Sequence, residues 1–472
     1  MGATTKSRHL IDLPGEDPGI SAHERLYRRI RSLVLSGALP SGNSLASSRT
    51  LAKHLGISRN SVLTAFDRLI ADGWLTARKS SGVYVTYSGG TAPRKCADIC
   101  AEEESRPFCL EARALDVFPA QLWNRLQSRR WKAISSANLQ FGDAQGWTRL
   151  REAISAHAAL TRGIDCSPDE VMVTTTVPAG IDLAVRALGL AGTEAWVEEP
   201  GYLAARRALQ NNAVRLASIR VDSAGLDVDY GKHVAPDARI AVVMSACHFP
   251  TNVAMSAARR EELLDWAQCS GAWIFEDDYD WQSTASTSPR PIASTCRANV
   301  IYLNSFNPML FPALRIAYMI CPASLLDRFA AVRFGLDQHS NVPNQMVMTD
   351  FIEGGHLDQH LRRLRDVYAE RRSALIRALE RELSDTMSPR RQSAGTQVVA
   401  TLHNLREGPL LACCAAGGVR LTGMQEFRLA ETGCHEIVFG FAGFPPATIA
   451  GSVRKMATAI GNTGAILATV SG

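Results

Sequence analysis

Lysine is scarce in this chain, and its distribution limits the chemistry that the chain can perform. The seven lysines among the 472 residues are Lys6, Lys53, Lys79, Lys95, Lys132, Lys232 and Lys455. Residues 233–454 therefore contain none. Because some enzymes use a lysine amine as nucleophile and general base, reactions that need such an amine from this part of the chain are excluded.

Long apolar runs and paired cysteines are also missing. No window offers 18 uncharged apolar residues, so we expect no membrane span and no membrane partner. The polar N-terminus has no apolar run of signal-peptide length, and we therefore expect a cytoplasmic protein. The eleven cysteines are scattered without a CxxC pair, which favours reduced, mostly buried thiols over a zinc site or a disulfide framework. We predict no metal site.

Positive charge is concentrated near the N-terminus. Residues 1–90 contain twelve Lys or Arg and six Asp or Glu, giving +6, whereas the whole chain carries +5. The remaining residues therefore carry −1. A chain of this length is expected to form two or three domains. A small basic domain attached to a near-neutral body indicates that the small domain binds a polyanion.

The N-terminal region shows the pattern of a helix-turn-helix followed by a β-wing. Apolar residues at helical spacing predict a helix over 22–36, and shorter helices are predicted over 47–56 and 59–72. Gly56 is the expected C-cap of the second helix, and Ser58 is the expected N-cap of the third. Residues 74–78 and 83–86 read as two strands joined by a turn at Gly82.

Residues 24–86 resemble the winged-helix domain of GntR-family repressors. The matching residues are Gly37, Pro40, Gly42, Leu45, Ser48, Arg49, Leu51, Ala52, Ser58, Arg59, Val62, Leu69, Gly73 and Gly82. The resemblance implies a DNA-binding domain over residues 20–88 and a double-stranded DNA operator as partner. The start of a recognition helix enters the major groove. We therefore expect the contacts to come from that turn, from the preceding helix and from the wing, through Arg49, Ser58, Arg59, Asn60, Ser61, Ser81 and Gly82.

The rest of the chain reads as a linker and an α/β domain. Residues 89–107 have few apolar residues and mixed charge, which predicts a linker. From residue 108 to residue 472, short apolar strands alternate with amphipathic helices, which predicts a mostly parallel sheet. Long helices and a small α+β C-terminal subdomain are expected at the end of the chain.

Five blocks of this larger domain, in order, resemble the aminotransferase-like domain of MocR-type regulators. They are Phe141–Gly146 with Leu150 and Arg151, Glu199–Tyr202, Phe249–Thr251, Glu276–Asp280 and Phe311–Arg315. The resemblance implies a fold-type I aminotransferase-like domain, a homodimer, and pyridoxal phosphate (PLP) as the family's cofactor. It assigns Tyr202, Asp277, Tyr279, Ser305 and Arg315 to the cofactor pocket, with Asp277 at the pyridine nitrogen and Arg315 at the phosphate.

Two departures from the family pattern put covalent PLP binding in doubt. Pro308 occupies the position at which the family carries its Schiff-base lysine. Pro178 removes a backbone N–H where the family's phosphate-binding turn would lie. Two alternatives remain open: PLP bound without a covalent bond, or a pocket that has lost PLP and takes another small molecule or none. Arg206 and Arg207 are further candidates for binding an effector carboxylate.

We therefore expect a DNA-binding transcriptional regulator, not an enzyme, with a degenerate aminotransferase-like sensor domain and an effector of undefined identity. The first alternative is a PLP-dependent aminotransferase that carries a DNA-binding domain, and Pro308 argues against it. The second is a DNA-binding dimer that responds to no ligand.

Overall fold

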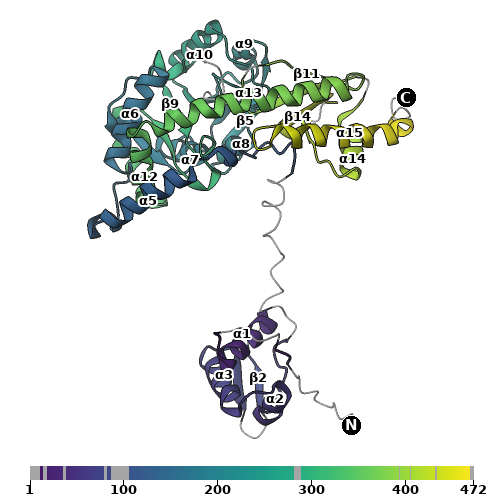
Figure 1. Ribbon diagram of the computed structural model, residues 1–472. Coiled ribbons are helices and arrows are strands. Elements are labelled where there is room, and N and C mark those ends of the chain that lie inside the picture. Colours follow the sequence, from purple (N-terminus) through teal and green to yellow (C-terminus); the bar gives the residue numbers. More distant parts are fainter. Residues whose placement is uncertain are drawn as a thin grey trace. The chain divides into compact units, whose positions relative to one another are not determined.

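The structure is a computed structural model that describes residues 11–13, 19–35, 39–78, 82–86, 106–280, 289–392, 394–403, 405–430 and 433–467. The chain divides into two compact units, Met1–Cys100 and Ala101–Gly472 (Figure 1). We call them the head and the body. None of the described helices is long and apolar enough to cross a membrane.

The head has the winged helix-turn-helix fold that the sequence predicted. Its helices are α1 (Ala22–Leu35), α2 (Ser48–Leu55) and α3 (Arg59–Ala71). Strands β1 (Leu75–Arg78) and β2 (Gly82–Val85) pair antiparallel and form the wing. Its core includes Leu26, Ile30, Leu51, Val62 and Leu69. The three helices pack around these side chains because their apolar positions recur at helical spacing.

Local caps fix where the head helices begin and end. The Ser47 hydroxyl accepts a hydrogen bond from the Thr50 N–H, and α2 ends at Gly56 in the left-handed conformation, with φ at 66°. Helix α3 begins in the same way, because the Ser58 hydroxyl accepts a hydrogen bond from the Ser61 N–H. The predicted caps at Gly56 and Ser58 are confirmed, and they fix the turn between α2 and α3.

The body is built on an eight-stranded sheet with the order β3-β10-β9-β8-β7-β4-β5-β6. The strands are β3 (Val171–Thr174), β4 (Glu194–Glu199), β5 (Arg215–Asp222), β6 (Gly225–Leu226), β7 (Ile240–Val243), β8 (Trp273–Asp277), β9 (Val300–Ser305) and β10 (Ala317–Ile320). Strands β9, β8, β7, β4 and β5 are parallel, whereas β10 is antiparallel to both β3 and β9. The predicted mostly parallel sheet is confirmed.

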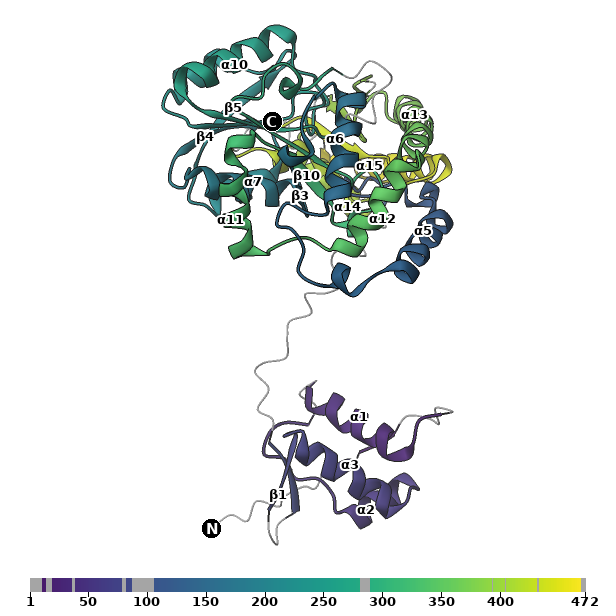
Figure 2. The same cartoon turned by 90° about the vertical axis from the view of Figure 1, so that its left-hand side faces the viewer.

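Helices cover both faces of this sheet, and alternate residues of each strand enter opposite cores. In β9, for example, Tyr302 belongs to one core and Leu303 to the other. Figure 2 shows α6 (Thr148–Arg162) and α12 (Val342–Glu353) on one side, with α7 (Val177–Leu188) and α11 (Leu326–Leu336) on the other. The remaining helices around the sheet are α5 (Ala120–Ala133), α8 (Leu203–Gln210), α9 (Val228–Val234) and α10 (Ala257–Ser270).

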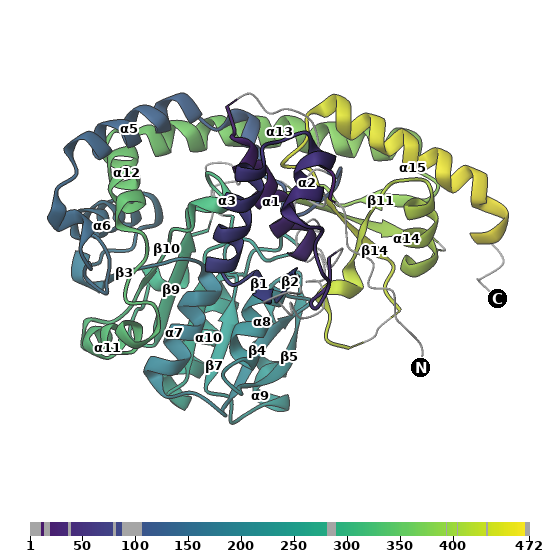
Figure 3. The same cartoon turned by 90° about the horizontal axis from the view of Figure 1, so that it is seen from below.

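A smaller α+β subdomain follows the large sheet, as predicted. Its four strands have the order β11-β12-β14-β13. They are β11 (Met387–Pro389), β12 (Gln397–Leu402), β13 (Thr422–Gly423) and β14 (Glu436–Gly440). Figure 3 shows β11 and β14 gathered with α14 (Glu407–Ala416) and α15 (Pro446–Leu467) at one side of the body. The long helix α13 (His356–Glu382) packs against α12, β11 and α15 and so links the two parts.

One strand boundary differs from the sequence prediction. The apolar residues after Phe311–Ala313 predict a strand that starts at Arg315, but β10 begins at Ala317. Arg315 is in the left-handed conformation, with φ at 56° and ψ at 44°, and ends a short 3-10 turn over Pro312–Leu314. A residue with this backbone cannot continue a strand. The nine cysteines within the described residues are all free thiols.

Candidate functional site

The start of α3 carries four of the residues predicted to contact DNA. The hydroxyls of Ser58 and Ser61 lie 2.9 Å apart, and Ser58 also caps the helix. Arg59 and Asn60 are exposed in this first turn. The Arg59 Nε donates to the Ser48 hydroxyl at 3.5 Å. This turn therefore presents a guanidinium and an amide to solvent, the groups that bond guanine and adenine edges most specifically.

The remaining predicted DNA contacts lie on α2 and on the wing. Arg49 is exposed at the second position of α2. Gly82 begins β2 opposite Arg78, and its φ of 115° is a conformation that residues with side chains rarely adopt. Ser81 lies outside the described residues. These placements agree with a surface that contacts phosphates on either side of a recognition helix.

The body contains a cavity of about 770 Å³ that brings all the predicted cofactor residues together. Its walls include Tyr202, Asp277, Tyr279, Ser305 and Arg315, as well as Pro308. These residues come from the carboxyl ends of β8 and β9 and from the loops after β4 and before β10. Ligands of open α/β sheets bind at this edge of the sheet. The cavity is therefore the candidate ligand site of the body.

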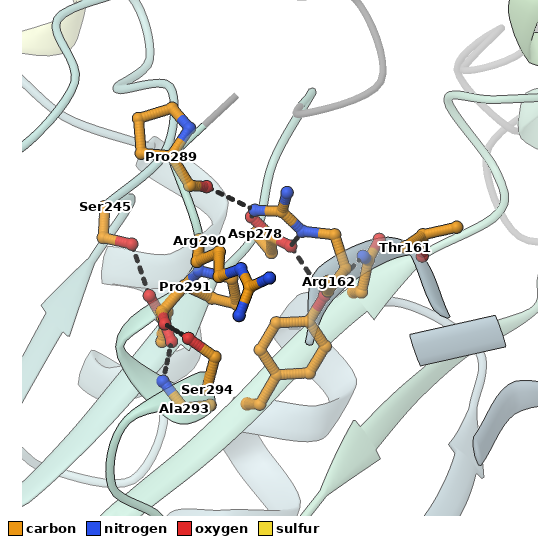
Figure 4. A network of polar contacts seen from close by, with 12 residues as sticks. Thr161, Arg162, Ser245, Asp278, Pro289, Arg290, Pro291, Ala293 and Ser294 are labelled. Carbon is orange, nitrogen blue, oxygen red and sulfur yellow. Dashed lines mark hydrogen bonds and ion pairs between the residues drawn. The ribbon is translucent and has the colours of Figure 1, made fainter. Parts of the chain in front are cut away.

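Asp277, at the end of β8, is a buried acid in the cavity wall. Its neighbours Glu276 and Asp278 are fully buried and hydrogen-bonded, and Figure 4 shows Asp278 bonded to Arg162. Arg162 donates to both oxygens of Asp278, at 2.6 and 2.9 Å. Glu276 accepts the N–H groups of Ile292 and Ala293 at 2.7 and 2.9 Å.

Asp277, in contrast, accepts no hydrogen bond and has no cationic partner within the described residues. Burial raises the pKa of Asp277 to about 8, with further contributions from the charges of Asp278 and Glu276. An N–H⁺ group placed beside Asp277 would lower this pKa again, because an opposite charge favours the ionised carboxylate. The cavity is thus suited to a ligand that carries a protonated ring nitrogen.

Aromatic side chains form one wall of the cavity. Phe249 packs edge-on against Tyr202, Tyr279 and Phe427, with ring centroids 6.2, 5.7 and 5.1 Å away. The Tyr279 hydroxyl lies 3.4 Å from the Thr396 hydroxyl. Burial raises the pKa of Tyr279 to about 12, although Arg113 opposes the shift. A flat apolar ligand would be contacted by these rings, and Tyr279 would remain a hydrogen-bond donor.

Arg315 is the cation predicted to bind phosphate. Its left-handed backbone follows directly from the Phe311–Leu314 turn, and its side chain is exposed at the cavity. The guanidinium forms no hydrogen bond or ion pair with any residue that the structure describes. An unpaired guanidinium can bind an anion through two parallel hydrogen bonds. Arg315 therefore places a guanidinium on the same cavity as the buried carboxyl of Asp277.

The helix start beside the cavity offers few backbone donors. Helix α7 begins with Thr176 as its N-cap and Pro178 in its first turn, and Thr176, Val177 and Pro178 line the cavity. The Thr176 hydroxyl already accepts the Ala179 N–H at 3.1 Å, and the Gly180 N–H donates to the Thr176 carbonyl at 3.1 Å. Only Val177 then keeps a free N–H in this turn, because proline has none.

The turn that holds Pro308 is fixed by Asn307. The Asn307 side chain donates to the Thr175 carbonyl at 3.0 Å and accepts the Ile316 N–H at 2.8 Å. Its own N–H donates to the Ser305 hydroxyl at 3.2 Å. Asn307 therefore holds together the two ends of the turn, and Ser305 is partly used. No lysine is among the described residues that line the cavity.

Several cavity residues escaped the sequence reasoning. Arg113 donates to the Thr396 hydroxyl at 3.1 Å, and residues 106–111 line the cavity, although 106 and 107 were assigned to the linker. No local motif marks these positions, because their partners, such as Thr396 for Arg113, lie far along the chain and meet them only in the folded protein. Of the two arginines suggested for an effector carboxylate, Arg207 lines the cavity and has no side-chain partner among the described residues.

Arg206 is wrong for that role. Its side chain is 3% exposed, and both of its terminal nitrogens are bonded within the body. It forms an ion pair with Glu199 at 2.8 Å and donates to the carbonyls of Phe427 and Glu198. Adjacent residues of a helix face different directions, so Arg206 holds the small subdomain while Arg207 faces the cavity.

Comparison with known proteins identifies both units. The family model described as bacterial regulatory proteins, gntR family, matches residues 22–85, and the one described as aminotransferase class I and II matches residues 117–435. The probable rhizopine catabolism regulatory protein MocR of Rhizobium meliloti is 29% identical over 94% of each chain. The pyridoxine biosynthesis transcriptional regulator PdxR of Corynebacterium glutamicum is 27% identical, covering 96% of this chain and 99% of its own.

Among solved structures, the α-aminoadipate aminotransferase LysN of Thermus thermophilus, complexed with N-(5'-phosphopyridoxyl)-L-leucine, superimposes with a TM-score of 0.69. It covers 79% of this chain and 97% of its own at 23% identity, so it supports the fold alone. The chain therefore belongs to the aminotransferase class I and II family through its body. Its gntR-type head and its similarity to MocR and PdxR are consistent with the MocR-type subfamily of GntR-family regulators.

Proposed function

We propose that the protein is a DNA-binding transcriptional regulator whose body senses a small molecule and does not catalyse transamination. The observation that carries the proposal is the composition of the cavity. It keeps a buried acid, Asp277, and a free guanidinium, Arg315, but it contains Pro308 in place of a lysine. Transamination needs an amine that attacks the cofactor and then moves the α-proton. No described cavity residue supplies one.

PLP bound without a covalent bond is the ligand that fits this cavity best. Asp277 would pair with the protonated pyridine nitrogen, Tyr279 would donate to the phenolic oxygen, and Tyr202 would pack on the ring. Arg315 would bind the phosphate, together with Ser305 and the Val177 N–H. When PLP is bound to a protein, it supplies an electrophilic carbon that reacts with amines. Covalent attachment to this chain does not fit, because residue 308 has no amine.

In the head, we propose that Arg59 and Asn60 contact base edges and that Arg49 binds a phosphate. Ser58 and Ser61 sit beside them at the helix start, and Gly82 with Ser81 lets the wing approach the duplex. The exposed turn of α3 supports these roles. Ligand binding in the body would change operator affinity by favouring one arrangement of the heads.

We also infer that the protein acts as a homodimer. Exposed apolar side chains occur at η2 (Ser136–Leu139) and at the end of α11, the two segments that lead to the contact between Phe141 and His339. Leu139, Phe141, Phe334 and Leu336 are between 50% and 83% exposed, and Phe141 contacts the His339 ring at 6.3 Å. Monomers rarely expose adjacent large apolar residues. A second copy would bury this patch and would place two heads on two half-sites.

The test of the sensor proposal is a calorimetric and absorbance titration of the full-length protein with PLP. We expect saturable binding and no adduct after borohydride reduction, as checked by mass spectrometry. Arg315→Ala should weaken binding by about tenfold to a hundredfold, the value of a lost charged hydrogen-bond pair. Arg377→Ala, an exposed arginine on α13, should bind as wild type does. A borohydride-stable adduct in wild type would refute the proposal.

A further inference from the structure

The segment that joins the head to the body forms part of the cavity wall. The last described residue of the head is Thr86, and the body is described from Arg106 onwards. From this first residue, the chain lines the cavity through Arg106, Pro107, Phe108, Cys109, Leu110, Glu111 and Arg113. A ligand in the cavity therefore touches the very residues from which the connection to the head departs. We call residues 106–113 the entry segment.

Phe108 anchors the entry segment to the small subdomain. Its side chain is 1% exposed and packs edge-on against Phe439 of β14, with ring centroids 5.2 Å apart. The Phe108 carbonyl accepts the Gly440 N–H at 3.1 Å. The φ of Phe108 is 71°, which is unfavourable for a bulky residue and persists only where the surroundings enforce it. The anchor therefore holds the segment in a conformation that it would leave if released.

Arg113 anchors the other end of the entry segment to residues at the cavity. It donates to the Thr396 hydroxyl at 3.1 Å, just before β12, and its charge acts on Tyr279 and Asp280. Tyr279 and Asp280 lie two and three positions after Asp277 in the chain. A ligand that engages Asp277 and Tyr279 therefore acts on Arg113 through one contact. The entry segment is tied both to the site of ligand contact and to β14.

Glycines allow the close contact between the entry segment and the small subdomain. A Cβ atom on Gly440 would lie 2.2 Å from the Cys109 carbonyl oxygen and 2.9 Å from the Leu110 Cα. A Cβ atom on Gly443 would lie 2.5 Å from the Ala112 Cβ. Neither glycine has a left-handed φ, so alanine is allowed at both positions by the backbone. Alanine there would displace the entry segment and leave Asp277, Tyr279 and Arg315 unchanged.

We propose that the entry segment is the element through which ligand occupancy reaches the DNA-binding head. A ligand packed against the entry segment stabilises the docking of this segment on β14. The docked segment fixes the point on the body to which the linker from the head is attached. This inference rests on the proposed sensor function, because it needs a ligand in the cavity. It adds the route by which that ligand controls operator binding.

The test uses full-length protein, PLP as the ligand, and an operator duplex selected from a random-sequence library. Operator affinity is measured by fluorescence anisotropy with and without saturating PLP, and PLP affinity by calorimetry. Hydrogen exchange of residues 106–113 reports release of the segment. We compare wild type with Gly440→Ala, with the milder Gly443→Ala, and with Gly408→Ala. The last is the matched control, because a Cβ atom on Gly408 meets nothing within 4 Å.

We expect PLP to change the operator affinity of wild type and of Gly408→Ala by at least about fivefold, a common size for allosteric coupling. Gly440→Ala and Gly443→Ala should still bind both PLP and operator, and the amide hydrogens of their entry segment should exchange faster. The ratio of their operator affinities with and without PLP should be near one. The inference is overturned if hydrogen exchange shows that the segment is released in either variant while PLP still changes operator affinity as much as it does in wild type.

A wild type whose operator affinity ignores PLP would refute the sensor function, and the ligand-free data then decide on the segment. Releasing it lengthens the connection to the head and lowers the effective concentration of the second head. A fall in ligand-free operator affinity of about twofold or more in Gly440→Ala, but not in Gly408→Ala, would support the role of the segment. Equal ligand-free affinities would overturn it.

Discussion

At the scale of single residues, the cavity wall contains a buried acid, Asp277, that lacks the hydrogen-bond donors found beside its two neighbours in the chain. Glu276 and Asp278 are each bonded by donors of the core, whereas Asp277, on the opposite face of the same strand, is buried without a cation. Strand alternation alone produces this separation. The body therefore carries a destabilising acid whose cost a suitable ligand would remove.

This cost predicts a pH-dependent stability. The pKa of Asp277 is raised from its unfolded value of about 4 to about 8 in the folded protein, so folding becomes less favourable as pH rises through that window. The slope is at most about 1.4 kcal/mol per pH unit for one group. Asp277→Asn removes it, so we expect the Tm of the variant to rise relative to wild type between about pH 5 and pH 8.

Two other acids define what the Tm measurement by circular dichroism should show apart from the effect of Asp277. Glu198, whose pKa burial also raises to about 8, should leave a residual slope in both proteins. Asp229→Asn removes an acid whose side chain is 82% exposed and should follow the wild-type curve. Parallel Tm curves for wild type and Asp277→Asn would show that the Asp277 carboxyl does not carry this cost.

Single residues were predicted from the sequence where a motif placed them. Asp277, Tyr279, Tyr202 and Arg315 were carried over from a family pattern, and all line one cavity. Arg113 could not be found in this way, because its contacts lie more than 150 positions further along the chain. Arg206 was misjudged because a sequence does not show which of two adjacent arginines faces a core.

At the scale of elements, the start of α7 limits the affinity of the cavity for phosphate. Helix N-termini bind anions through their free N–H groups and their dipole. Pro178 removes one of these groups, and Thr176 occupies another. The N-cap at Thr176 and the proline at position 178 stabilise the start of α7, but they leave fewer backbone N–H groups free to bind phosphate.

Restoring the missing donor should therefore strengthen phosphate binding. We expect Pro178→Ala to raise the affinity for PLP by about tenfold, the value of one hydrogen bond to a charged group. The matched control is Pro343→Ala, which alters the same position of the first turn of α12, away from the cavity. Calorimetric titrations of both variants with PLP make the comparison. Equal PLP affinities for Pro178→Ala and wild type would contradict the assignment of this turn to phosphate.

Elements were predictable where local signals were strong. The head helices, with serine N-caps and a glycine C-cap, were placed to within a residue or two. Strand β5 has no strong local signal, because polar and charged residues interrupt its apolar residues. The start of β10 was misplaced because a left-handed Arg315 depends on the packing of the preceding turn.

At the scale of the whole molecule, the exposed apolar patch predicts the oligomeric state. Phe141→Glu places a charge in the patch, which a dimer interface would not tolerate without a large desolvation cost. We expect sedimentation velocity to show dimers for wild type and mainly monomers for this variant at micromolar concentration. Val234→Glu changes an exposed apolar residue at the end of α9 and should remain dimeric. A dimeric Phe141→Glu would place the interface elsewhere.

The domain limits of residues 20–88, 89–107 and 108–472 remain predictions, although the fold of each unit was predictable from its sequence pattern. The sequence did not show that the chain enters the body along the cavity wall. That arrangement needs β14, some 330 positions downstream, to meet Phe108. This arrangement is the basis for proposing the entry segment as the route from the cavity to the head.

The most direct test of this account is the operator affinity of the full-length protein, measured with and without PLP under identical salt. Arg59→Gln, which removes the guanidinium from the recognition turn, serves as the variant with weakened operator binding. The account predicts that PLP changes the wild-type affinity by at least about fivefold, without a borohydride-stable adduct. An affinity that is unchanged at saturating PLP, or a change that appears only with covalent attachment, would contradict it.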